Sequence, residues 1–422
     1  MSNQLCISNA RYLGVAVDLF VREGCVASLA PHGETTPPAG TEVFDATGLV
    51  LFPSFIDAHV HLREPGFEYK EDIASGLAAA AHGGFGAVMC MANTKPVNDD
   101  AAITRFIIDT ARKAWPHGPR VHPVGGATVG LKGTELAPMA ELAEAGCVAF
   151  SNDGAPVPDT EMFRRAVEYA ADLGRVVIDH CEDPYLAKGA HMNEGETSGR
   201  IGVKGQPDIG EALHVARDIL LADYLNLPIH LAHISSRRSV ELIAWAKQRG
   251  VKVTAETCPH YLLLDDTALA GYDTNAKVNP PLRTPADVDT LREAVRTGVI
   301  DMFVTDHAPH AAHEKETPLD EAPNGISGLD TAVALTWQLV CQGVLTEDDL
   351  VRLWSREPAR VFGLACNQFE PGDPADFFLL DPAEEWVVSR ATMHSKSCNT
   401  PFLGKTLTGR VKAHWMGGHR IA

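Results

Sequence analysis

Two histidines with one residue between them, His59 and His61, follow an apolar segment that spans residues 50–56. Side chains alternate between the two faces of a β-strand, so both imidazoles would project from one face at the end of the strand. Two neighbouring imidazoles supply half of a metal site. If the strand belongs to a parallel barrel, its carboxyl end is also where catalytic groups gather.

Later predicted strands end in titratable side chains as well. With the first pair, they give four histidines and two aspartates at five strand ends: His59, His61, Asp153, His180, His233 and Asp306. This nitrogen and oxygen ligand set is typical of zinc or another borderline divalent ion. A single such histidine would usually be a core residue, but five strand ends together favour a metal centre. Other histidines have no such position and are predicted to be structural: His82, His122, His214 and His230.

A centre of this kind is suited to hydrolysis or its reverse. A divalent metal lowers the pKa of bound water from about 15.7 to about 7, which gives a hydroxide nucleophile at neutral pH. The metal also polarises the carbonyl under attack. A neighbouring carboxylate takes the proton and delivers it to the leaving nitrogen, as a general base and then a general acid.

The elements that would position these residues alternate along residues 49–309. Predicted strands lie at residues 51–62, 86–93, 120–124, 147–152, 176–180, 229–234, 251–255 and 302–305. Predicted helices between them include residues 72–82, 101–114, 159–173, 209–225 and 238–249. Eight strands alternating with helices predict a closed, TIM-like (β/α)8 barrel. An open doubly wound sheet is the alternative, although no Gly-x-Gly-x-x-Gly turn follows the first strand.

Both ends of the chain are predicted to be rich in strands. The runs lie at residues 12–20, 25–29 and 42–43 and, after a helix at 350–362, at 376–380, 385–388 and 410–415. Since chain ends often lie close together, we expect both ends to form one small β-sandwich domain. The predicted domains are a barrel at residues 53–365 and a β-domain built from residues 1–52 and 366–422.

The composition argues against several classes of protein. A net charge of −19 disfavours nucleic acid or an anionic membrane as a partner. No apolar run approaches the roughly 20 residues of a membrane span. Nine dispersed cysteines, no Cys-x-x-Cys pair and no visible signal peptide predict reduced thiols and a cytoplasmic protein. An anionic substrate would need a local positive site made by metal or arginine.

Four motifs carry a family resemblance: residues 59–66, 91–96, 277–283 and 305–310. The His-x-His strand with the later histidines and aspartate resembles the amidohydrolase superfamily, and the four motifs resemble class I dihydroorotase within it. Residues 372–376 and 409–411 resemble the small β-domain of that superfamily. The resemblance covers nearly the whole chain. It implies interconversion of (S)-dihydroorotate and N-carbamoyl-L-aspartate in pyrimidine biosynthesis.

The resemblance also implies roles for the strand-end residues. His59, His61 and Asp306 would hold one zinc, His180 and His233 a second, and Asp153 would bridge the two. Many relatives use a carboxylated lysine as the bridge. The resemblance leaves the number of zincs per subunit open between one and two. Asp306 would be the general base and acid. Asn152 stands where many members have a second acid, and we expect its side chain to point away from the site.

Substrate contacts follow from the same resemblance. Arg63 shares the strand face of His61 and offers a planar fork for the substrate carboxylate. Asn93 and His310 would assist it, and Asn279 would hydrogen-bond the ring or the ureido group. Asn324 and Gly325 replace a more usual Phe-Gly in the loop of residues 311–327. We expect this loop to contact substrate, with a lid and a surface excursion as the alternatives.

Two other functions are alternatives to the dihydroorotase activity. A hydantoinase or allantoinase would typically carry the lysine bridge, and allantoinase-like sequences lack an arginine at the position of Arg63. A non-catalytic subunit that only scaffolds aspartate transcarbamoylase would have lost metal ligands, and here all six are present. A complex with aspartate transcarbamoylase and a homo-oligomer are the partners that the resemblance implies.

Overall fold

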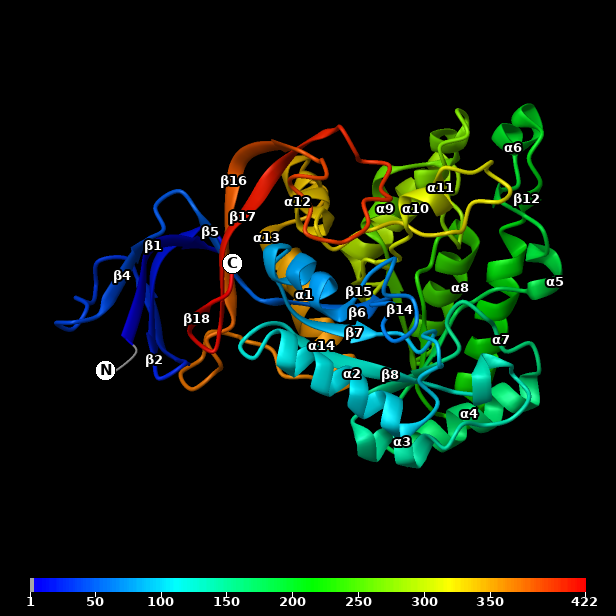
Figure 1. The fold of residues 1–422 in the computed structure, drawn as a ribbon, viewed down its shortest axis with the longest axis horizontal. Coiled ribbons are helices and arrows are strands. Elements are labelled where there is room, and N and C mark those ends of the chain that lie inside the picture. Colours follow the sequence, from blue (N-terminus) through cyan, green and yellow to red (C-terminus); the bar gives the residue numbers. More distant parts are fainter. Residues whose placement is uncertain (1–3) are drawn as a thin grey trace.

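Eight parallel strands form a barrel in the computed structural model, which describes residues 4–422 (Figure 1). Their order is β15–β14–β13–β10–β9–β8–β7–β6. The strands are β6 (Phe55–Val60), β7 (Phe85–Cys90), β8 (Arg120–Gly126), β9 (Ala149–Ser151), β10 (Val177–Asp179), β13 (Ile229–Leu231), β14 (Val253–Thr257) and β15 (Met302–Phe303). A parallel bridge between Val60 and His307 joins the first strand to the segment after the last. The predicted fold class is confirmed.

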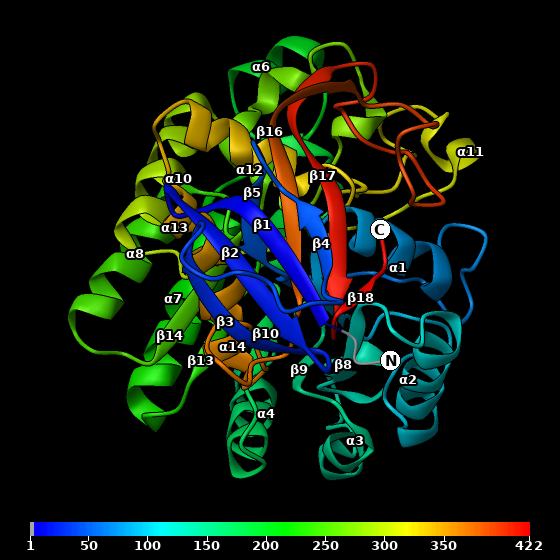
Figure 2. The same cartoon turned by 90° about the vertical axis from the view of Figure 1, so that its left-hand side faces the viewer.

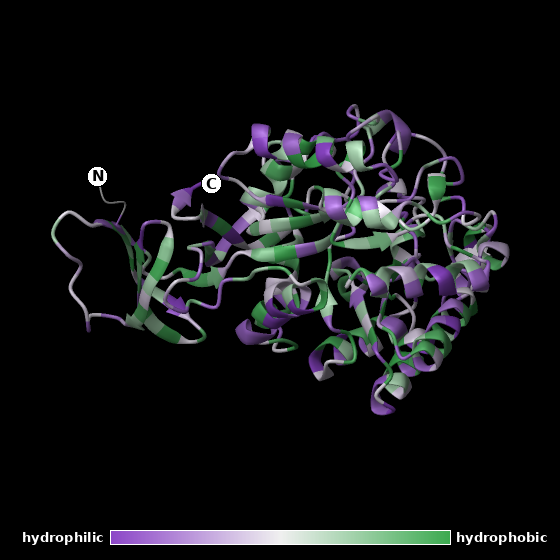
Figure 3. Ribbon diagram, turned by 90° about the horizontal axis from the view of Figure 1, so that it is seen from below, coloured by the Kyte–Doolittle hydropathy of each residue, from purple (hydrophilic) through white to green (hydrophobic). Residues whose placement is uncertain are grey.

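Helices between the strands cover the outside of the barrel. They are α1 (Ile73–His82), α2 (Ala101–Ala114), α3 (Met139–Ala145), α4 (Thr160–Asp172), α7 (Ile209–Leu225), α8 (Arg237–Gln248) and α10 (Pro285–Thr297), followed by α12 (Ala332–Cys341), α13 (Glu347–Val351) and α14 (Glu357–Phe362). The five predicted barrel helices match α1, α2, α4, α7 and α8 to within one residue at each end. Apolar segments concentrate on the central strands in Figure 3, whereas outer helix turns are more hydrophilic.

Local sequence explains where several of these helices begin. The side chains of Asp72, Asp100, Asp159 and Ser236 each accept a hydrogen bond from a backbone N–H in the first turn of the helix that follows. Among residues 4–422, none of the helices combines the length and the apolar character that a membrane span requires.

The predicted strand at residues 51–62 is in fact two strands. β5 (Val50–Pro53) pairs with β16 (Phe377–Val387) of the terminal sheet, whereas β6 pairs with β7 of the barrel. Ser54, the one residue between β5 and β6, donates its N–H to Asp376 O. Both strands are buried along their whole length, so hydrophobicity does not mark the change of sheet.

A second, mostly antiparallel sheet unites the two ends of the chain, in the order β18–β17–β16–β5–β1–β2–β3, with β4 beside β1. Its remaining strands are β1 (Gln4–Tyr12), β2 (Val15–Arg22), β3 (Cys25–Pro31), β4 (Glu42–Asp45), β17 (Thr406–Met416) and β18 (His419–Arg420). Figure 2 shows the blue strands from the start of the chain beside orange β16 and red β17 from its end. Ile7, Leu19, Phe377 and Trp415 pack in one shared core.

Two strand predictions at the chain ends were wrong in detail. The run at residues 12–20 is broken by a turn at Leu13 and Gly14, which have φ values of 47° and 82°. Most of β1, which precedes this turn, was not predicted. The runs at 376–380 and 385–388 form one strand, β16, whose register shifts between Asp381 and Glu385. Polar residues at that irregularity interrupt the apolar pattern, so two strands were predicted where the structure has one.

Candidate metal centre and substrate pocket

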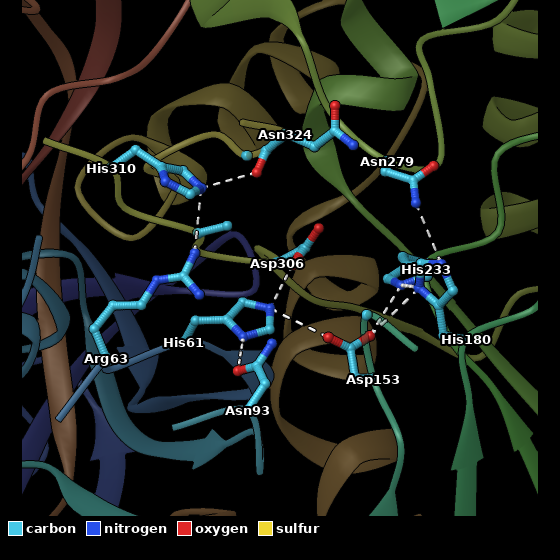
Figure 4. A pocket seen from close by; sticks show the side chains of 13 residues that line it. His61, Arg63, Asn93, Asp153, His180, His233, Asn279, Asp306, His310 and Asn324 are labelled. Atoms are coloured by element: carbon cyan, nitrogen blue, oxygen red, sulfur yellow. Dashed lines mark hydrogen bonds and ion pairs between the residues drawn. The ribbon is translucent and has the colours of Figure 1, made fainter. Parts of the chain in front are cut away.

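The six strand-end residues converge at the carboxyl end of the barrel. His59 lies in β6, and the others follow the ends of β6, β9, β10, β13 and β15 by one to three residues: His61, Asp153, His180, His233 and Asp306. All six are buried. Figure 4 shows Asp153 between His61 on one side and the pair of His180 and His233 on the other. The structure therefore brings together every predicted ligand.

Asp153 is the centre of this cluster. Its Oδ1 lies 3.3 Å from His59 Nε2, 3.3 Å from His233 Nε2 and 3.5 Å from His180 Nδ1. Its Oδ2 lies 3.4 Å from His61 Nε2. Asp306 Oδ1 lies 3.1 Å from the same His61 nitrogen. The Asp153 carboxylate thus faces all four imidazoles, and the Asp306 carboxylate lies near His59 and His61.

The donor set fits a metal ion. Two groups of three ligand atoms share Asp153: one with His59 and His61, the other with His180 and His233. His59 Nε2 is buried and has no hydrogen-bond partner among the described residues. His180 Nδ1 and His233 Nε2 lie only 2.9 Å apart, and two ring nitrogens this close need a shared proton or a cation between them. Divalent cations with nitrogen and oxygen preference match this chemistry.

Buried hydrogen bonds orient the ligand histidines. Glu256 Oε1 accepts from His59 Nδ1 at 2.7 Å, and its Oε2 lies 3.0 Å from His230 Nε2. With Nδ1 held in this way, the lone pair of His59 Nε2 would be directed at a metal bound in the centre. Asn93 Oδ1 accepts from His61 Nδ1 at 2.8 Å and does the same for His61. Asn93, predicted as a substrate contact, thus also orients a ligand.

Glu256 was not predicted to belong to the site, and its partner His230 was predicted to be only structural. The predicted seventh strand ended at Ala255, whereas β14 continues to Thr257. A lone acid at the end of a buried strand was the available signal. Asn152 behaves as expected: its side chain turns away from the cluster, with Oδ1 3.1 Å from Thr128 N and Nδ2 2.7 Å from Thr128 Oγ1.

Mutual electrostatics keep the acids of the centre ionised. Burial opposes charge on Asp153, but His59, His180 and His233 hold its pKa well below the usual value. Burial likewise opposes charge on Asp306, and the hydrogen bond from His61 with the charge of His59 lowers its pKa. The two carboxylates stay charged because the histidines offset their negative charge. A bound cation would offset the same charge.

Three residues of the site have left-handed backbone conformations. The φ values are 63° for Arg63, 33° for His233 and 46° for Asp306. For residues other than glycine this costs on the order of 1–3 kcal/mol each, and such residues cluster at active sites. The strain is consistent with side chains that are aimed by the surrounding fold.

A cavity of about 280 Å³ opens beside the cluster. Its lining includes all six predicted substrate contacts: Arg63, Asn93, Asn279, His310, Asn324 and Gly325. Five of the six predicted metal ligands line it too, with His59 buried behind them. The cavity therefore connects the candidate metal centre with Arg63, the one arginine among the described residues that line it.

The hydrogen bonds around His310 leave the fork of Arg63 available. Lys70 Nζ donates a hydrogen bond to His310 Nδ1 at 3.2 Å, and His310 Nε2 donates one to Asn324 O at 2.9 Å. Burial and the nearby cations Arg63 and Lys70 lower the pKa of His310 to about 2, so the ring is neutral. Arg63 Nε donates to Pro309 O at 3.2 Å, but Nη2 faces the His310 N–H rather than an acceptor. A carboxylate is the group that would complete this fork.

Asn279 is positioned by an acid that the sequence reasoning also missed. Its Nδ2 donates to Glu182 Oε2 at 2.7 Å. Glu182 Oε2 lies 3.4 Å from His180 Nε2 as well. Burial opposes charge on Glu182, yet His180 and Asn279 lower its pKa to about 2. With Nδ2 held, the Asn279 carbonyl oxygen remains to accept a hydrogen bond.

Two buried lysines fasten the loop of residues 311–327. Lys277 Nζ donates to Leu319 O at 2.5 Å and Ala322 O at 2.6 Å. Lys315 Nζ donates to Thr274 O at 2.9 Å and Pro323 O at 2.8 Å. These bonds hold the loop segment that carries Asn324 and Gly325 against the cavity.

Solved structures with this architecture include proteins named hydantoinase and dihydropyrimidinase. The L-hydantoinase of Arthrobacter aurescens superposes with a TM-score of 0.88 at 23% identity, covering 100% of this chain and 96% of that one. The dihydropyrimidinase of Brevibacillus agri superposes with a TM-score of 0.82 at 23% identity, with 99% and 95% covered. The fold and the strand-end cluster define an amidohydrolase-type barrel.

Sequence relatives narrow this class. Residues 48–239 match a family model described as dihydro-orotase-like. A protein named dihydroorotase from Geobacter metallireducens is 48% identical over 402 residues, which is 95% of this chain and 94% of that protein. One of the same name from Pelobacter propionicus is 47% identical over 421 residues, 100% and 98% of the two chains. The chain belongs to the dihydroorotase family and is an enzyme, a cyclic amidohydrolase of pyrimidine biosynthesis.

Proposed function

We propose that the protein is a zinc-dependent dihydroorotase that interconverts (S)-dihydroorotate and N-carbamoyl-L-aspartate. One observation carries the proposal: Asp153 faces four histidines in a cavity that Arg63 also lines. Both substrates carry a carboxylate that takes no part in the reaction, and Arg63 matches that group. Hydantoin and allantoin lack it, so Arg63 favours dihydroorotate over these two compounds.

The metal would be held by the six clustered residues. His59, His61 and Asp306 would hold one zinc, His180 and His233 a second, with Asp153 between the two positions. Bound zinc supplies a Lewis acid that lowers the pKa of water and polarises the ring carbonyl. Glu256 and Asn93 would keep the ligand nitrogens of His59 and His61 unprotonated toward the metal.

The protein's own groups would bind the substrate and move the proton. Arg63, with Asn93 and the neutral His310 beside it, would hold the carboxylate. Asn279, whose carbonyl is free to accept, would bind an N–H of the ring or ureido group. Asn324 and Gly325 would close the cavity wall. Asp306 would take a proton from the attacking water and deliver it to the ring nitrogen that leaves.

Domain limits, assembly and location belong to the same proposal. The barrel would span residues 53–365 and the β-domain residues 1–52 and 366–422. A homo-oligomer and a complex with aspartate transcarbamoylase remain part of the proposal. Exposed apolar side chains at helical spacing on α7 offer a contact surface: Ile209, Leu213, Leu220 and Tyr224. Nine cysteines that are all free thiols are consistent with a cytoplasmic enzyme.

The decisive experiment combines metal analysis with turnover of three substrates. The purified protein should contain one or two zinc ions per chain and open dihydroorotate far faster than hydantoin or allantoin. His61→Ala should lose metal and activity while keeping its circular dichroism spectrum. If the zinc-loaded protein opens hydantoin but leaves dihydroorotate intact, or if His61→Ala keeps normal activity and zinc content, the proposal is wrong.

A further inference from the structure

A second cavity, of about 670 Å³, lies at the opposite end of the barrel from the catalytic pocket. Its walls are the last turns of α2, the loop of residues 115–119, the start of β8 and the turn between β17 and β18. The cavity thus lies between the barrel and the terminal sheet. Its volume falls within the roughly 300–1,000 Å³ of ordinary small-molecule sites.

The charge of this cavity contrasts with that of the chain. Among residues 4–422, its lining includes two arginines and three histidines but no aspartate or glutamate: Arg112, Arg120, His117, His122 and His419. The chain as a whole carries a net charge of −19. Arg112 forms no ion pair or hydrogen bond among the described residues, and Arg120 uses Nη1 for Asp376 Oδ2 at 2.7 Å. Apart from Asp376, which pairs with Arg120, the cavity presents cationic and neutral groups, so in an acidic protein it favours an anion over a cation.

The other walls are flat and apolar. Trp115, Pro116, Pro119, Ile108 and Met416 line the cavity. Trp115 Nε1 donates to Ala74 O at 3.1 Å, which fixes the indole. The ring of His117, in the loop of residues 115–119, stacks on the ring of His419, in β18, with centroids 4.3 Å apart.

His122 contributes hydrogen bonding rather than charge. Burial, together with the nearby cation of Arg120, lowers its pKa to about 4. A neutral imidazole both donates and accepts, as the polar edge of a heterocycle requires. The cavity therefore combines flat walls, two guanidinium groups and a neutral polar edge.

We propose that this cavity binds an aromatic heterocycle that carries a phosphate, the chemistry of a nucleoside monophosphate. The ring would lie against Trp115 and the stacked pair of His117 and His419, since bases stack on such side chains in many proteins. The phosphate would bind Arg112 and the unused nitrogens of Arg120, whose planar forks suit it. The site is separate from the catalytic pocket and independent of the reaction there.

Isothermal titration calorimetry on the full-length protein tests this site. The probes are UMP and AMP, with uridine and inorganic phosphate as the separate halves. At least one nucleotide should bind with a dissociation constant on the order of 100 μM or lower, and each half at least 10-fold more weakly. Arg112→Gln and His419→Ala should each weaken nucleotide binding at least 10-fold. Arg105→Gln, which changes an exposed arginine on the same helix outside the cavity, should bind normally.

Three results of these titrations would overturn the inference, and a competition experiment supplies a fourth. One is the absence of binding by either nucleotide at about 1 mM. Another is equal affinity in the wild type, Arg112→Gln and His419→Ala, and the last is phosphate alone binding as tightly as the nucleotide. Repeating the titration with saturating dihydroorotate assigns the location, because nucleotide heat that disappears there belongs to the catalytic pocket and refutes the site. Both variants lie at exposed positions, and circular dichroism checks that they fold.

Discussion

Glu256 Oε1 lies 2.7 Å from His59 Nδ1, and neither side chain has any surface exposed to solvent. The second oxygen of the same carboxylate lies 3.0 Å from His230 Nε2. Burial opposes charge on His59, yet Asp153 and Glu256 raise its pKa well above the usual value. A carboxylate behind a ligand histidine increases the basicity of the imidazole toward a metal.

Glu256→Gln should therefore weaken zinc binding by about 10- to 100-fold, since the amide keeps the shape but loses the charge. Competition with a chromogenic chelator measures the affinity. Glu385→Gln, an exposed change in β16, serves as the control. Unchanged zinc affinity in Glu256→Gln would show that its charge does not act on the centre.

Asp306→Asn should retain zinc but lose roughly 10²-fold or more in turnover, because an amide cannot carry the proton. The lowered pKa of Asp306 sets the direction of the pH dependence. Hydrolysis needs the carboxylate and should fall on the acid side of the profile. Cyclisation needs the protonated partner state and should have its optimum at lower pH. A zinc-containing Asp306→Asn enzyme with comparable rates in both directions would remove Asp306 from the mechanism.

Arg63→Lys should lower kcat/KM for dihydroorotate by an amount that corresponds to about 2–5 kcal/mol, since an ammonium cannot reproduce the bidentate fork. Steady-state kinetics in both directions measure the effect. Arg105→Lys provides an exposed control for the same replacement. A kcat/KM that does not change in Arg63→Lys would exclude the role in carboxylate binding.

Lys315 should make stability depend on pH. Burial and the nearby Lys277 lower its pKa from the model-compound 10.5 to about 7. Between pH 7 and 10.5 the unfolded chain holds a proton that the folded chain has released, so the contribution of Lys315 to stability rises with pH. The slope is up to about 1.4 kcal/mol per pH unit, and the full penalty applies below pH 7.

Thermal unfolding of the wild type and Lys315→Met at pH 6, 7 and 9 measures this. The Tm of the wild type minus the Tm of Lys315→Met should increase between pH 7 and 9 and stay constant between pH 6 and 7. Lys113→Met, at an exposed lysine, should show no such trend. A constant difference across the whole range would contradict the lowered pKa.

The sequence predicted the ligand cluster because strand periodicity and barrel topology are local rules that fix where strand-end side chains meet. It did not predict Glu256, because one acid next to a predicted strand end looks like any turn residue until the fold places it behind His59. The break at Ser54 was missed because β5 and β6 are equally apolar. The fastening of the loop by Lys277 and Lys315 depends on backbone carbonyls, which carry no sequence signature.

The pairing of β5 with β16 has a consequence for how the chain is made. Phe52 pairs with Phe378, which is synthesised 326 residues after it. At about 5–20 residues per second, the edge of β5 waits roughly 15–65 s for its partner. An unpaired, apolar strand edge is a site for wrong association during that time. The terminal sheet is therefore completed only as synthesis ends, and the edge of β5 that faces β16 stays unpaired until then.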